Sequence, residues 1–351
     1  LAGRVACLGL GDPVLHHARL EVDGAPFDAG NEEHVAEIHD ALTAAWERSA
    51  PSGLALQPQW AEAKRVVSTA QMPLPSSPLS LAMVPGDGGD RLVTGTRSGS
   101  VLVWSVDGER VGEFTAQGAV HALCMTDLEP DGVPEVLVGS DDEYLYALSG
   151  DGDLLWKRQI PFMLEKQIWM WWTLGSAKVR KIHTDDLTGD GVPEILVGAG
   201  NMHLHCLDNS GKERWNFRMD HGICTTIVTA NLLADGKRHV LAGNGLTSSN
   251  GYCRIFDASG REQRRLFNGS WCTSLPAVAV GDLDGDGIAT VFCGTNRGNL
   301  RAYDVQQSKG EQLWIHNTTR PIRSLLTFAR TAVSSGLVVA ASDSGYVCAF
   351  D

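Results

Sequence analysis

A unit of about 45 residues recurs along this chain, and this recurrence restricts the fold more than any other feature. Five clear copies occupy residues 92–114, 136–160, 195–219, 240–267 and 291–315. In each copy an apolar strand closes on Gly, a polar hairpin follows, and a second alternating strand ends near Asp or Ser. A turn then leads into a third strand, which often holds Trp. Repeats of this length are typical of propellers and solenoids.

A further apolar strand precedes most copies, at residues 120–128, 179–187, 225–232 and 277–283. Four strands per unit is the number in one propeller blade, so the sequence predicts an all-β protein, a β-propeller of about six four-stranded blades. The last copy, residues 337–351, ends after its third strand. We expect residues 63–71 to supply its outer strand by pairing with the strand that contains Val347 and Ala349, which would close the ring.

Residues 1–62 do not follow the repeat and predict a short α/β segment in front of a propeller at residues 63–351. Two short strands precede a helix in which Val35, Ile38, Leu42 and Trp46 have helical spacing. This segment is expected either to pack on the propeller or to be the remnant of a preceding domain, and a seventh, degenerate blade is the alternative. Because the chain begins at Leu1, we expect a mature or excised piece from which a targeting signal or an upstream domain was removed.

The loops in these repeats resemble those of two known propeller families. Residues 127–140, 186–199 and 282–295 are similar to FG-GAP or integrin-type repeats, and residues 143–156 and 298–314 resemble quinoprotein-like (PQQ-like) repeats. This resemblance implies the propeller fold, but propellers host enzymes, binding modules and scaffolds alike. Quinoprotein dehydrogenases use a vicinal cysteine pair, and no Cys-Cys occurs here, so PQQ is not expected. Some secreted polysaccharide lyases are also propellers with similar repeats.

Acidic loops between the first and second strands suggest calcium. The candidate ligands are Asp127, Glu129, Asp131 and Glu135 in one loop, Asp186, Asp190 and Glu194 in the next, and Asp282, Asp284 and Asp286 in the fifth repeat. Calcium takes several converging oxygens, and alternate acidic residues with a turning Gly can supply them. The resemblance to integrin-type loops implies a final acidic residue, from which Thr290 departs. The ion would be structural, and the alternative is that these Asp side chains only cap their own turns.

At the opposite end of each blade, loops are expected to surround one mouth of the central channel, where propeller ligands usually bind. His121 and Arg180 occupy one equivalent position at the first strand of consecutive blades, and Arg323 falls close to it in the last blade. These side chains would make a local positive spot on an acidic protein, or else be ordinary solvated residues. As a lyase site, His121 would be the base, Arg180 or Arg323 the carboxylate neutraliser and Tyr144 the acid.

One connection between repeats is far longer than the others and carries Trp169, Trp171 and Trp172. Trp271, one connection further on, is a candidate to join them. Exposed aromatic faces stack on sugars and pack against proteins, so these residues are candidate ligand contacts. The alternative is that the three tryptophans form a small satellite core under their loop.

Charge and motifs exclude several classes of function. A net charge of −13 argues against nucleic acid as a partner. No apolar run is long enough to span a membrane, and no GxSxG, Walker or HExxH motif occurs. No CxxC occurs among the eight cysteines, of which Cys124, Cys206, Cys253, Cys293 and Cys348 are expected as small buried hydrophobes. For Cys224 and Cys272, the alternative is a disulfide bridge between the two.

The sequence therefore favours an extracellular or periplasmic binding or accessory module that recognises carbohydrate, or a protein partner, through its mouth. The alternative is an enzyme, a polysaccharide lyase that acts on a uronate-containing chain. A subunit whose missing upstream domain carries the activity is a third hypothesis.

Overall fold

The computed structural model describes residues 5–8, 19–22, 25–26, 72–85, 89–161, 176–219, 222–245, 250–271, 273–283, 288–306, 310–328, 336–345 and 347–350. The chain divides into two units, Leu1–Ser68 and Thr69–Asp351. In the first unit, β1 (Val5–Leu8), β2 (Arg19–Val22) and β3 (Ala25–Pro26) form a three-stranded antiparallel sheet. The helix expected near residues 35–46 lies outside the described residues. No helix in the described part of the chain is long and apolar enough to cross a membrane.

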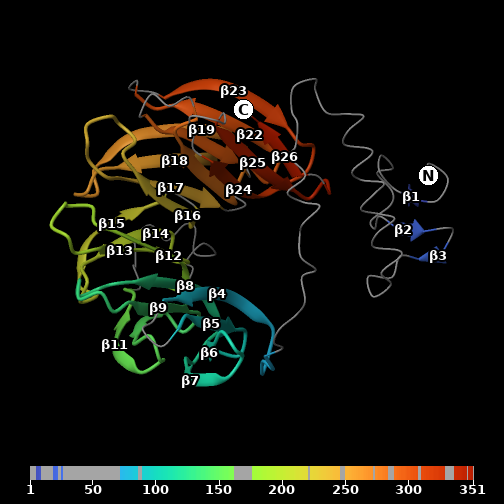
Figure 1. The fold of residues 1–351 in the computed structure, drawn as a ribbon. Helices are drawn as coiled ribbons and strands as arrows, with labels where there is room; N and C mark the ends of the chain where they lie inside the picture. The colour runs from blue at the N-terminus through green and yellow to red at the C-terminus, as the bar shows by residue number, and fades with distance from the viewer. Residues whose placement is uncertain are drawn as a thin grey trace. The chain divides into compact units, whose positions relative to one another are not determined.

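The second unit consists of six successive antiparallel sheets, which we number blades 1 to 6 (Figure 1). Their first strands are β4 (Pro78–Val84), β8 (Val120–Thr126), β12 (Val179–Asp185), β16 (Ile223–Ala230), β20 (Ala277–Gly281) and β24 (Ile322–Phe328). Their second strands are β5 (Arg91–Thr96), β9 (Glu135–Ser140), β13 (Glu194–Ala199), β17 (His239–Gly245), β21 (Thr290–Gly294) and β25 (Leu337–Ser342).

The third strands are β6 (Ser100–Ser105), β10 (Tyr144–Leu148), β14 (His203–Leu207), β18 (Asn250–Phe256), β22 (Asn299–Asp304) and β26 (Val347–Phe350). The fourth strands of blades 1 to 5 are β7 (Arg110–Thr115), β11 (Leu154–Gln159), β15 (Glu213–Arg218), β19 (Glu262–Trp271) and β23 (Glu311–Asn317). Each sheet pairs its strands in chain order, which is the meander of a propeller blade. The prediction of an all-β propeller with about six blades is confirmed.

The buried core lies between neighbouring blades. One apolar cluster combines Leu137 and Leu145 of blade 2 with Val179 and Ile195 of blade 3, and similar clusters join the other neighbours from blade 1 to blade 6. The middle strands are apolar on both faces because each blade packs against two others. In β9 and β13, for example, all residues are buried.

Three tryptophans of fourth strands each pack against the following blade. Trp156 of blade 2 packs against Gly211 of blade 3, and Trp215 of blade 3 lies against Gly260 of blade 4. Trp215 also donates a hydrogen bond from Nε1 to the Ala258 carbonyl (2.9 Å). Trp314 of blade 5 contacts the ring of Phe350 in blade 6, with centroids 5.7 Å apart. These three side chains therefore join adjacent blades.

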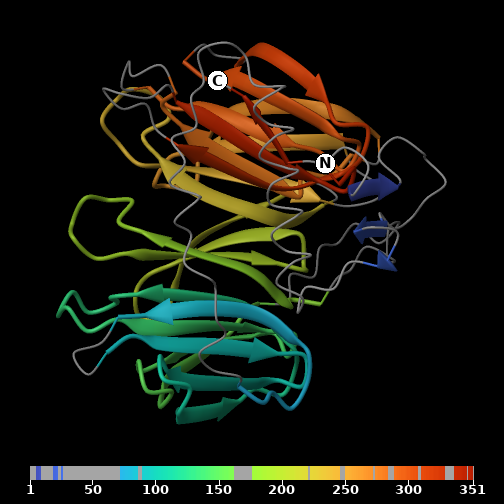
Figure 2. The same ribbon diagram turned by 45° about the vertical axis from the view of Figure 1, so that its right-hand side comes forward.

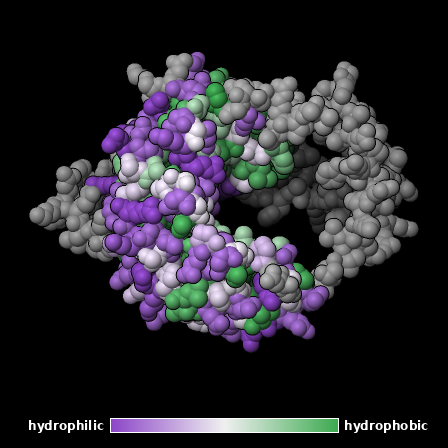
Figure 3. Space-filling view, turned by 60° about the vertical axis from the view of Figure 1, so that its left-hand side comes forward, coloured by the Kyte–Doolittle hydropathy of each residue, from purple (hydrophilic) through white to green (hydrophobic). Residues whose placement is uncertain are grey.

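Strand direction sorts the loops into two ends. The loops between first and second strands, and between third and fourth strands, lie at one end of every blade, which we call the acidic end. The loops between second and third strands lie at the other, together with the interblade connections; we call this the mouth end. Figure 2 shows the sheets stacked with their loops at these two edges. Figure 3 shows one side of the molecule, where hydrophobic residues form small separate patches on a mainly hydrophilic surface.

Blade 6 contains three strands, β24, β25 and β26, among the described residues. The expected donor of a fourth strand, residues 63–71, lies outside the described residues. Closure of the ring by this segment therefore stays a prediction.

Two glycines with the same backbone conformation allow the interblade contact to be tested. Gly260 and Gly189 both have a φ of +79°. A Cβ at Gly260 would lie 2.5 Å from Trp215 Cδ2, whereas a Cβ at Gly189 meets nothing within 4 Å. Gly189→Ala should cost only the left-handed strain, about 1 to 2 kcal/mol. Gly260→Ala should cost about 1 to 3 kcal/mol more, because Trp215 must move. Equal midpoints of urea unfolding for the two variants would contradict this packing.

Candidate functional site

The mouth end brings three basic side chains onto one carboxylate. Asp141 follows β9, and its Oδ1 lies 3.1 Å from Arg180 Nη1 and 3.4 Å from His121 Nε2. Lys178 Nζ lies 3.8 Å from the other oxygen, Oδ2. His121 is in blade 2, whereas Lys178 and Arg180 are at the start of blade 3, so this Asp141 cluster spans the interblade junction. The structure thus brings together two of the sequence candidates, His121 and Arg180.

The charge of the cluster is unbalanced. Lys178 and Arg180 supply two positive charges against the single negative charge of Asp141, and protonation of His121 would add a third. Burial, followed by the charge of Arg180, lowers the pKa of His121 below its ordinary value, although Asp141 acts in the opposite direction. The imidazole is therefore largely neutral near pH 7 and lies beside a fixed guanidinium.

Arg323 occupies the corresponding strand position in blade 6 and has a carboxylate of its own. Its Nε lies 2.9 Å and its Nη2 2.6 Å from Asp343 Oδ2. This hydrogen bond raises the pKa of Arg323 and lowers that of Asp343. Asp343 follows β25 as Asp141 follows β9, and both backbone amides bond to the carbonyl just before the first strand. The structure therefore repeats one arrangement in blades 2 and 6 but does not place Arg323 on Asp141.

Basic residues outnumber acidic ones at the described part of the mouth end. The basic residues there include Arg97, His121, Lys178, Arg180, Arg297, Arg320 and Arg323. The acidic residues there are Asp141, Asp142, Glu143 and Asp343. Asp142 is also occupied internally, since its Oδ2 accepts hydrogen bonds from the Gln117 amide and the Tyr146 hydroxyl. The described part of the mouth end is therefore a positive region on a chain whose net charge is −13.

Tyr144, the acid candidate, has a different environment from His121. Its ring lies 5.9 Å from the ring of Tyr146, and the Lys157 ammonium lies 5.2 Å from its centroid. It packs against the apolar cluster between blades 1 and 2. Tyr144 is therefore part of an aromatic group at that interface, and no contact with His121, Arg180 or Asp141 is seen in the described residues.

The long connection between blades 2 and 3 leaves and re-enters the propeller at the mouth end. The Glu143 carbonyl accepts a hydrogen bond from the Ile160 amide (2.9 Å), and its side-chain Oε1 accepts one from the Ala177 amide (3.2 Å). Asn201 Nδ2 donates to the Pro161 carbonyl (2.9 Å). Sequence reasoning missed Glu143 and Asn201, which hold both ends of this connection beside the Asp141 cluster.

Three of the tryptophans proposed as ligand contacts, Trp169, Trp171 and Trp172, lie outside the described residues. Trp271 ends β19, where its backbone pairs with Asn250. The ligand-contact hypothesis for these four residues stays a prediction.

At the acidic end, the described carboxylates cap their own turns. Asp127 accepts hydrogen bonds from the amides of Asp131 (3.1 Å) and Gly132 (2.9 Å), and Asp186 accepts those of Gly189 and Gly191 (both 2.7 Å). These hydrogen bonds lower the pKa of Asp186, and the bond from the Gly191 amide has the largest effect.

Four of the remaining acidic candidates also accept hydrogen bonds from backbone amides of their own loops. Glu135 Oε2 accepts a hydrogen bond from the Leu128 amide, and Glu194 Oε2 accepts one from the Leu187 amide. Burial raises the pKa of both glutamates. Asp131 and Asp190 cap the amides of Val133 and Val192 in the same way. Asp284 and Asp286 lie outside the described residues, and Glu129 and Asp282 lie in the described part of their loops. Within that part, no three His, Cys, Asp or Glu side chains gather as metal ligands, and calcium binding by these loops stays a prediction.

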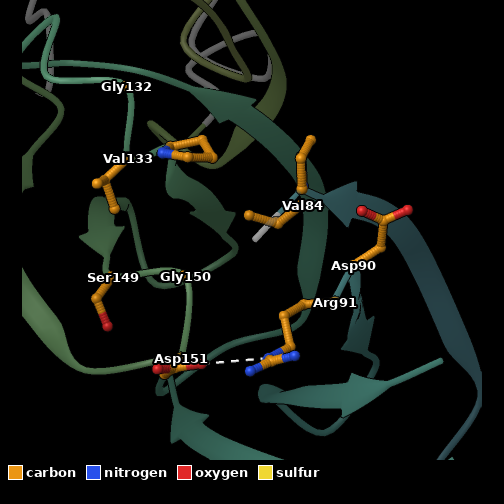
Figure 4. Close-up of a pocket in the computed structure, with 10 residues that line it drawn as sticks. Val84, Asp90, Arg91, Gly132, Val133, Ser149, Gly150 and Asp151 are labelled. Atoms are coloured by element: carbon orange, nitrogen blue, oxygen red, sulfur yellow. Dashed lines mark hydrogen bonds and ion pairs between the residues drawn. The ribbon is translucent and has the colours of Figure 1, made fainter. Parts of the chain in front are cut away.

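A cavity of about 530 Å³ opens between blades 1 and 2 at the acidic end (Figure 4). Val84, Val133 and Gly150 contribute to its lining, and Arg91 lies across it from Asp151 with Nε 3.3 Å from Oδ1. The lining therefore holds one cation, Arg91, and two carboxylates, Asp90 and Asp151. The cavity therefore lacks the positive excess of the Asp141 cluster, and Arg91 is a suitable control for the mouth arginines.

Glu143 allows a test of how the long connection is anchored. Glu143 has a φ of 73°, so Glu143→Ala and Glu143→Gln retain the same backbone strain. Only Gln keeps an oxygen for the Ala177 amide. Glu143→Ala should speed chymotryptic cleavage within residues 162–175 by roughly fivefold, the worth of one hydrogen bond, whereas Glu143→Gln should match the wild type. Equal cleavage rates for all three proteins would exclude the anchor.

Calcium binding at the acidic end also has a direct test. An ion that binds only the native state raises the melting temperature by mass action. If the loops take calcium, the melting temperature should rise in millimolar calcium relative to chelator, and Asp186→Asn should reduce this rise. Identical melting in both conditions would leave turn capping as the role of these carboxylates.

Comparisons with known proteins agree with the fold. A family model described as the lambda-carrageenase beta-propeller domain matches residues 162–266. The KICSTOR complex protein ITFG2 of Mus musculus is 24% identical over 143 residues, which are 37% of this chain and 31% of that protein. The chain thus spans about a third of the length of this curated relative.

Solved structures extend the similarity over most of the chain. Sqt1 of Saccharomyces cerevisiae has a TM-score of 0.62 at 15% identity, covering 80% of this chain and 74% of its own. The Dos1 propeller has a TM-score of 0.56 at 17% identity, covering 79% and 67%. BBS1N, solved in complex with ARL6DN, has a TM-score of 0.55 at 13% identity, covering 79% and 78%. At these identities the likeness shows the fold alone, and that fold is a β-propeller.

Proposed function

We propose that this protein is a binding or accessory propeller whose mouth end recognises an anionic ligand, with a carbohydrate as the first candidate. The observation that carries the proposal is the Asp141 cluster, in which Lys178, Arg180 and His121 share one carboxylate. An incoming carboxylate or sulfate group would balance the remaining positive charge.

The geometry favours binding because the cations are held in place before a ligand arrives. Arg180 is fixed on Asp141, and Arg323 is fixed on Asp343 by two nitrogens. Side chains that are already ordered lose less conformational entropy on binding. Guanidinium groups also present a planar pair of donors that suits carboxylate and sulfate oxygens.

Two observations bear on the chemical class of the ligand. The family model that matches residues 162–266 is that of a carrageenase, which favours carbohydrate, and the matched segment includes the connection with Trp169, Trp171 and Trp172. BBS1N, one of the similar solved structures, was solved in complex with ARL6DN, so an acidic protein surface is the alternative ligand. We retain extracellular or periplasmic location as part of the carbohydrate proposal.

A polysaccharide lyase is the second candidate function, because His121 is neutral near pH 7 and lies beside Arg180 at Asp141. Lyase chemistry needs a base of this kind and a cation that neutralises the uronate carboxylate. The environment of Tyr144 in an aromatic group favours binding over catalysis, since the acid would have to come from another residue.

The binding proposal predicts that two arginines, each paired with a carboxylate, differ in their effect on affinity for a polysaccharide. Arg180→Gln should weaken binding to a sulfated or uronate polysaccharide by roughly tenfold or more, because a hydrogen bond between charged groups is lost. Arg91→Gln, at the acidic end, should leave affinity unchanged. Affinity electrophoresis with a neutral polysaccharide as control measures both. Equal loss in the two variants, or equal affinity for the neutral polymer, would argue against the mouth as the site.

Binding should also depend on pH through His121. Its pKa is lowered in the free protein, and a bound anion favours the protonated form. Affinity for a sulfated polymer, whose charge is constant, should therefore rise as the pH falls from about 7.5 through the His121 pKa. His121→Gln should remove this rise. The same variant separates the two functions: a lyase would release unsaturated products from a polyuronate and lose about a hundredfold in rate, whereas a binding module would release none.

A further inference from the structure

A buried histidine links the start of the long connection to the outer strand of blade 3. His205 is in the third strand, β14, and has no exposed surface. Its Nδ1 lies 2.7 Å from Glu213 Oε2, and its Nε2 lies 3.2 Å from Asn201 Nδ2. Asn201 Nδ2 also donates a hydrogen bond to the Pro161 carbonyl (2.9 Å). A chain of hydrogen bonds therefore runs from Glu213 through the imidazole to Pro161.

The orientation of Asn201 determines which nitrogen of His205 carries the proton. Asn201 Oδ1 accepts a hydrogen bond from the His203 amide (3.1 Å), so the Asn201 side chain cannot turn over without losing that bond. Its Nδ2 therefore faces both the Pro161 carbonyl and His205 Nε2. Because an amide nitrogen only donates, Nε2 must accept, and the ring proton must be on Nδ1, where it is donated to Glu213. The chain is complete only when His205 is neutral.

The packing around His205 is apolar. Strand alternation places His205 on the same face of β14 as Leu207, which packs on blade 2, and Val197 of β13 is paired opposite it. Blade 2 contributes Leu145 and Ile160 to this cluster. A charge on the imidazole would therefore be placed in a site with little access to water.

Charged groups at this junction act in both directions. In the described part of the junction they are Glu213 and Arg218 of β15, His203 of β14, Arg158 of β11 and Glu143 before β10. Burial lowers the pKa of His205 and His203 adds to this effect, although the Glu213 carboxylate acts in the opposite direction. Neutral His205 therefore stabilises the fold above its ordinary pKa of 6.5, and this contribution is lost as the pH falls below that value.

We propose that His205 is an acid-sensitive switch in the anchor of the long connection: a proton taken up at Nε2 ends the hydrogen bond with Asn201 and weakens the hold of Asn201 on Pro161. A protonated imidazole donates from both nitrogens, so Nε2 then faces the N–H groups of Asn201. Asn201 cannot present its oxygen instead, because the His203 amide holds that oxygen.

The two ends of the chain of hydrogen bonds respond differently. Nδ1 keeps its proton and its bond to Glu213, whose other oxygen, Oε1, accepts a hydrogen bond from Asn216 Nδ2 (2.8 Å). The change therefore falls on the Pro161 side, at the mouth end. This inference does not depend on which ligand the mouth end binds, because it concerns bonds within the fold.

The test is chymotryptic cleavage within residues 162–175 at about pH 7.5 and about pH 5.5, on either side of the ordinary range of histidine. Each rate is divided by that of a free peptide of the same sequence at the same pH. The ratio for the wild type should rise roughly fivefold at the lower pH, the effect of one lost hydrogen bond. His205→Gln can accept from Asn201 and donate to Glu213 but takes up no proton, so its ratio should not change with pH.

His183→Gln is the matched control. His183 is a half-buried histidine of the same blade whose pKa burial also lowers, but its Nε2 bonds to Thr229 Oγ1 (2.8 Å) and not to Asn201. This variant should keep the full rise, which separates the switch from general unfolding in acid.

The tautomer has a test of its own in the unaltered protein. The nitrogen chemical shifts of labelled histidine should show the proton of His205 on Nδ1 at neutral pH, with the signal assigned by its absence in His205→Gln. A proton on Nε2 would overturn the proposal, as would a wild-type cleavage ratio that does not change with pH. A rise that persists in His205→Gln would overturn it as well.

Discussion

The packing of each blade on the next is the interaction on which the rest of this structure depends. A four-stranded sheet of this size cannot bury both of its faces alone, and the clusters between blades supply the core. The fourth-strand tryptophans strengthen these junctions, since Trp156 and Trp215 fit against glycines of the following blade that have no side chain to displace them. Because the junctions repeat, equivalent loops of successive blades come to the same end of the unit.

The two ends then use several of their carboxylates differently, although one plan is repeated in each blade. At the acidic end, Asp186 accepts hydrogen bonds from the amides of Gly189 and Gly191 in its own loop, whereas Asp151 pairs with the single cation Arg91. At the mouth end, carboxylates are shared with arginine, lysine and histidine, as in Asp141 with Arg180. Carboxylates saturated by amides have little left for a ligand, whereas a carboxylate surrounded by several cations leaves a positive excess. This difference assigns ligand recognition to the mouth end in our account.

Much of the fold could be predicted from the sequence, because strand alternation and the spacing of the copies are local signals. The equivalence of His121 and Arg180 also followed from counting within the repeat. Trp104 lies in the third strand of its blade, β6, whereas Trp156, Trp215 and Trp314 lie in fourth strands.

The site could be predicted only in part, because its interactions cross between blades. Asp141 sits in a hairpin that reads as an ordinary polar turn, and its role depends on two side chains about 40 residues further along. Glu143 and Asn201 likewise hold a connection whose ends they meet only in three dimensions. Tyr144, the acid candidate from the sequence, is packed by the fold beside Tyr146. Such pairings depend on the ring geometry, which no single repeat contains.

Hydrogen exchange measured by mass spectrometry, with and without a sulfated polysaccharide, tests the central claim most directly. Our account predicts that bound ligand slows exchange in the loops of the mouth end, residues 97–99, 116–121, 141–143, 176–180 and 318–323, and leaves the acidic end unchanged. Protection confined to the acidic loops, residues 127–134 and 186–193, would contradict the assignment of the mouth end as the binding face.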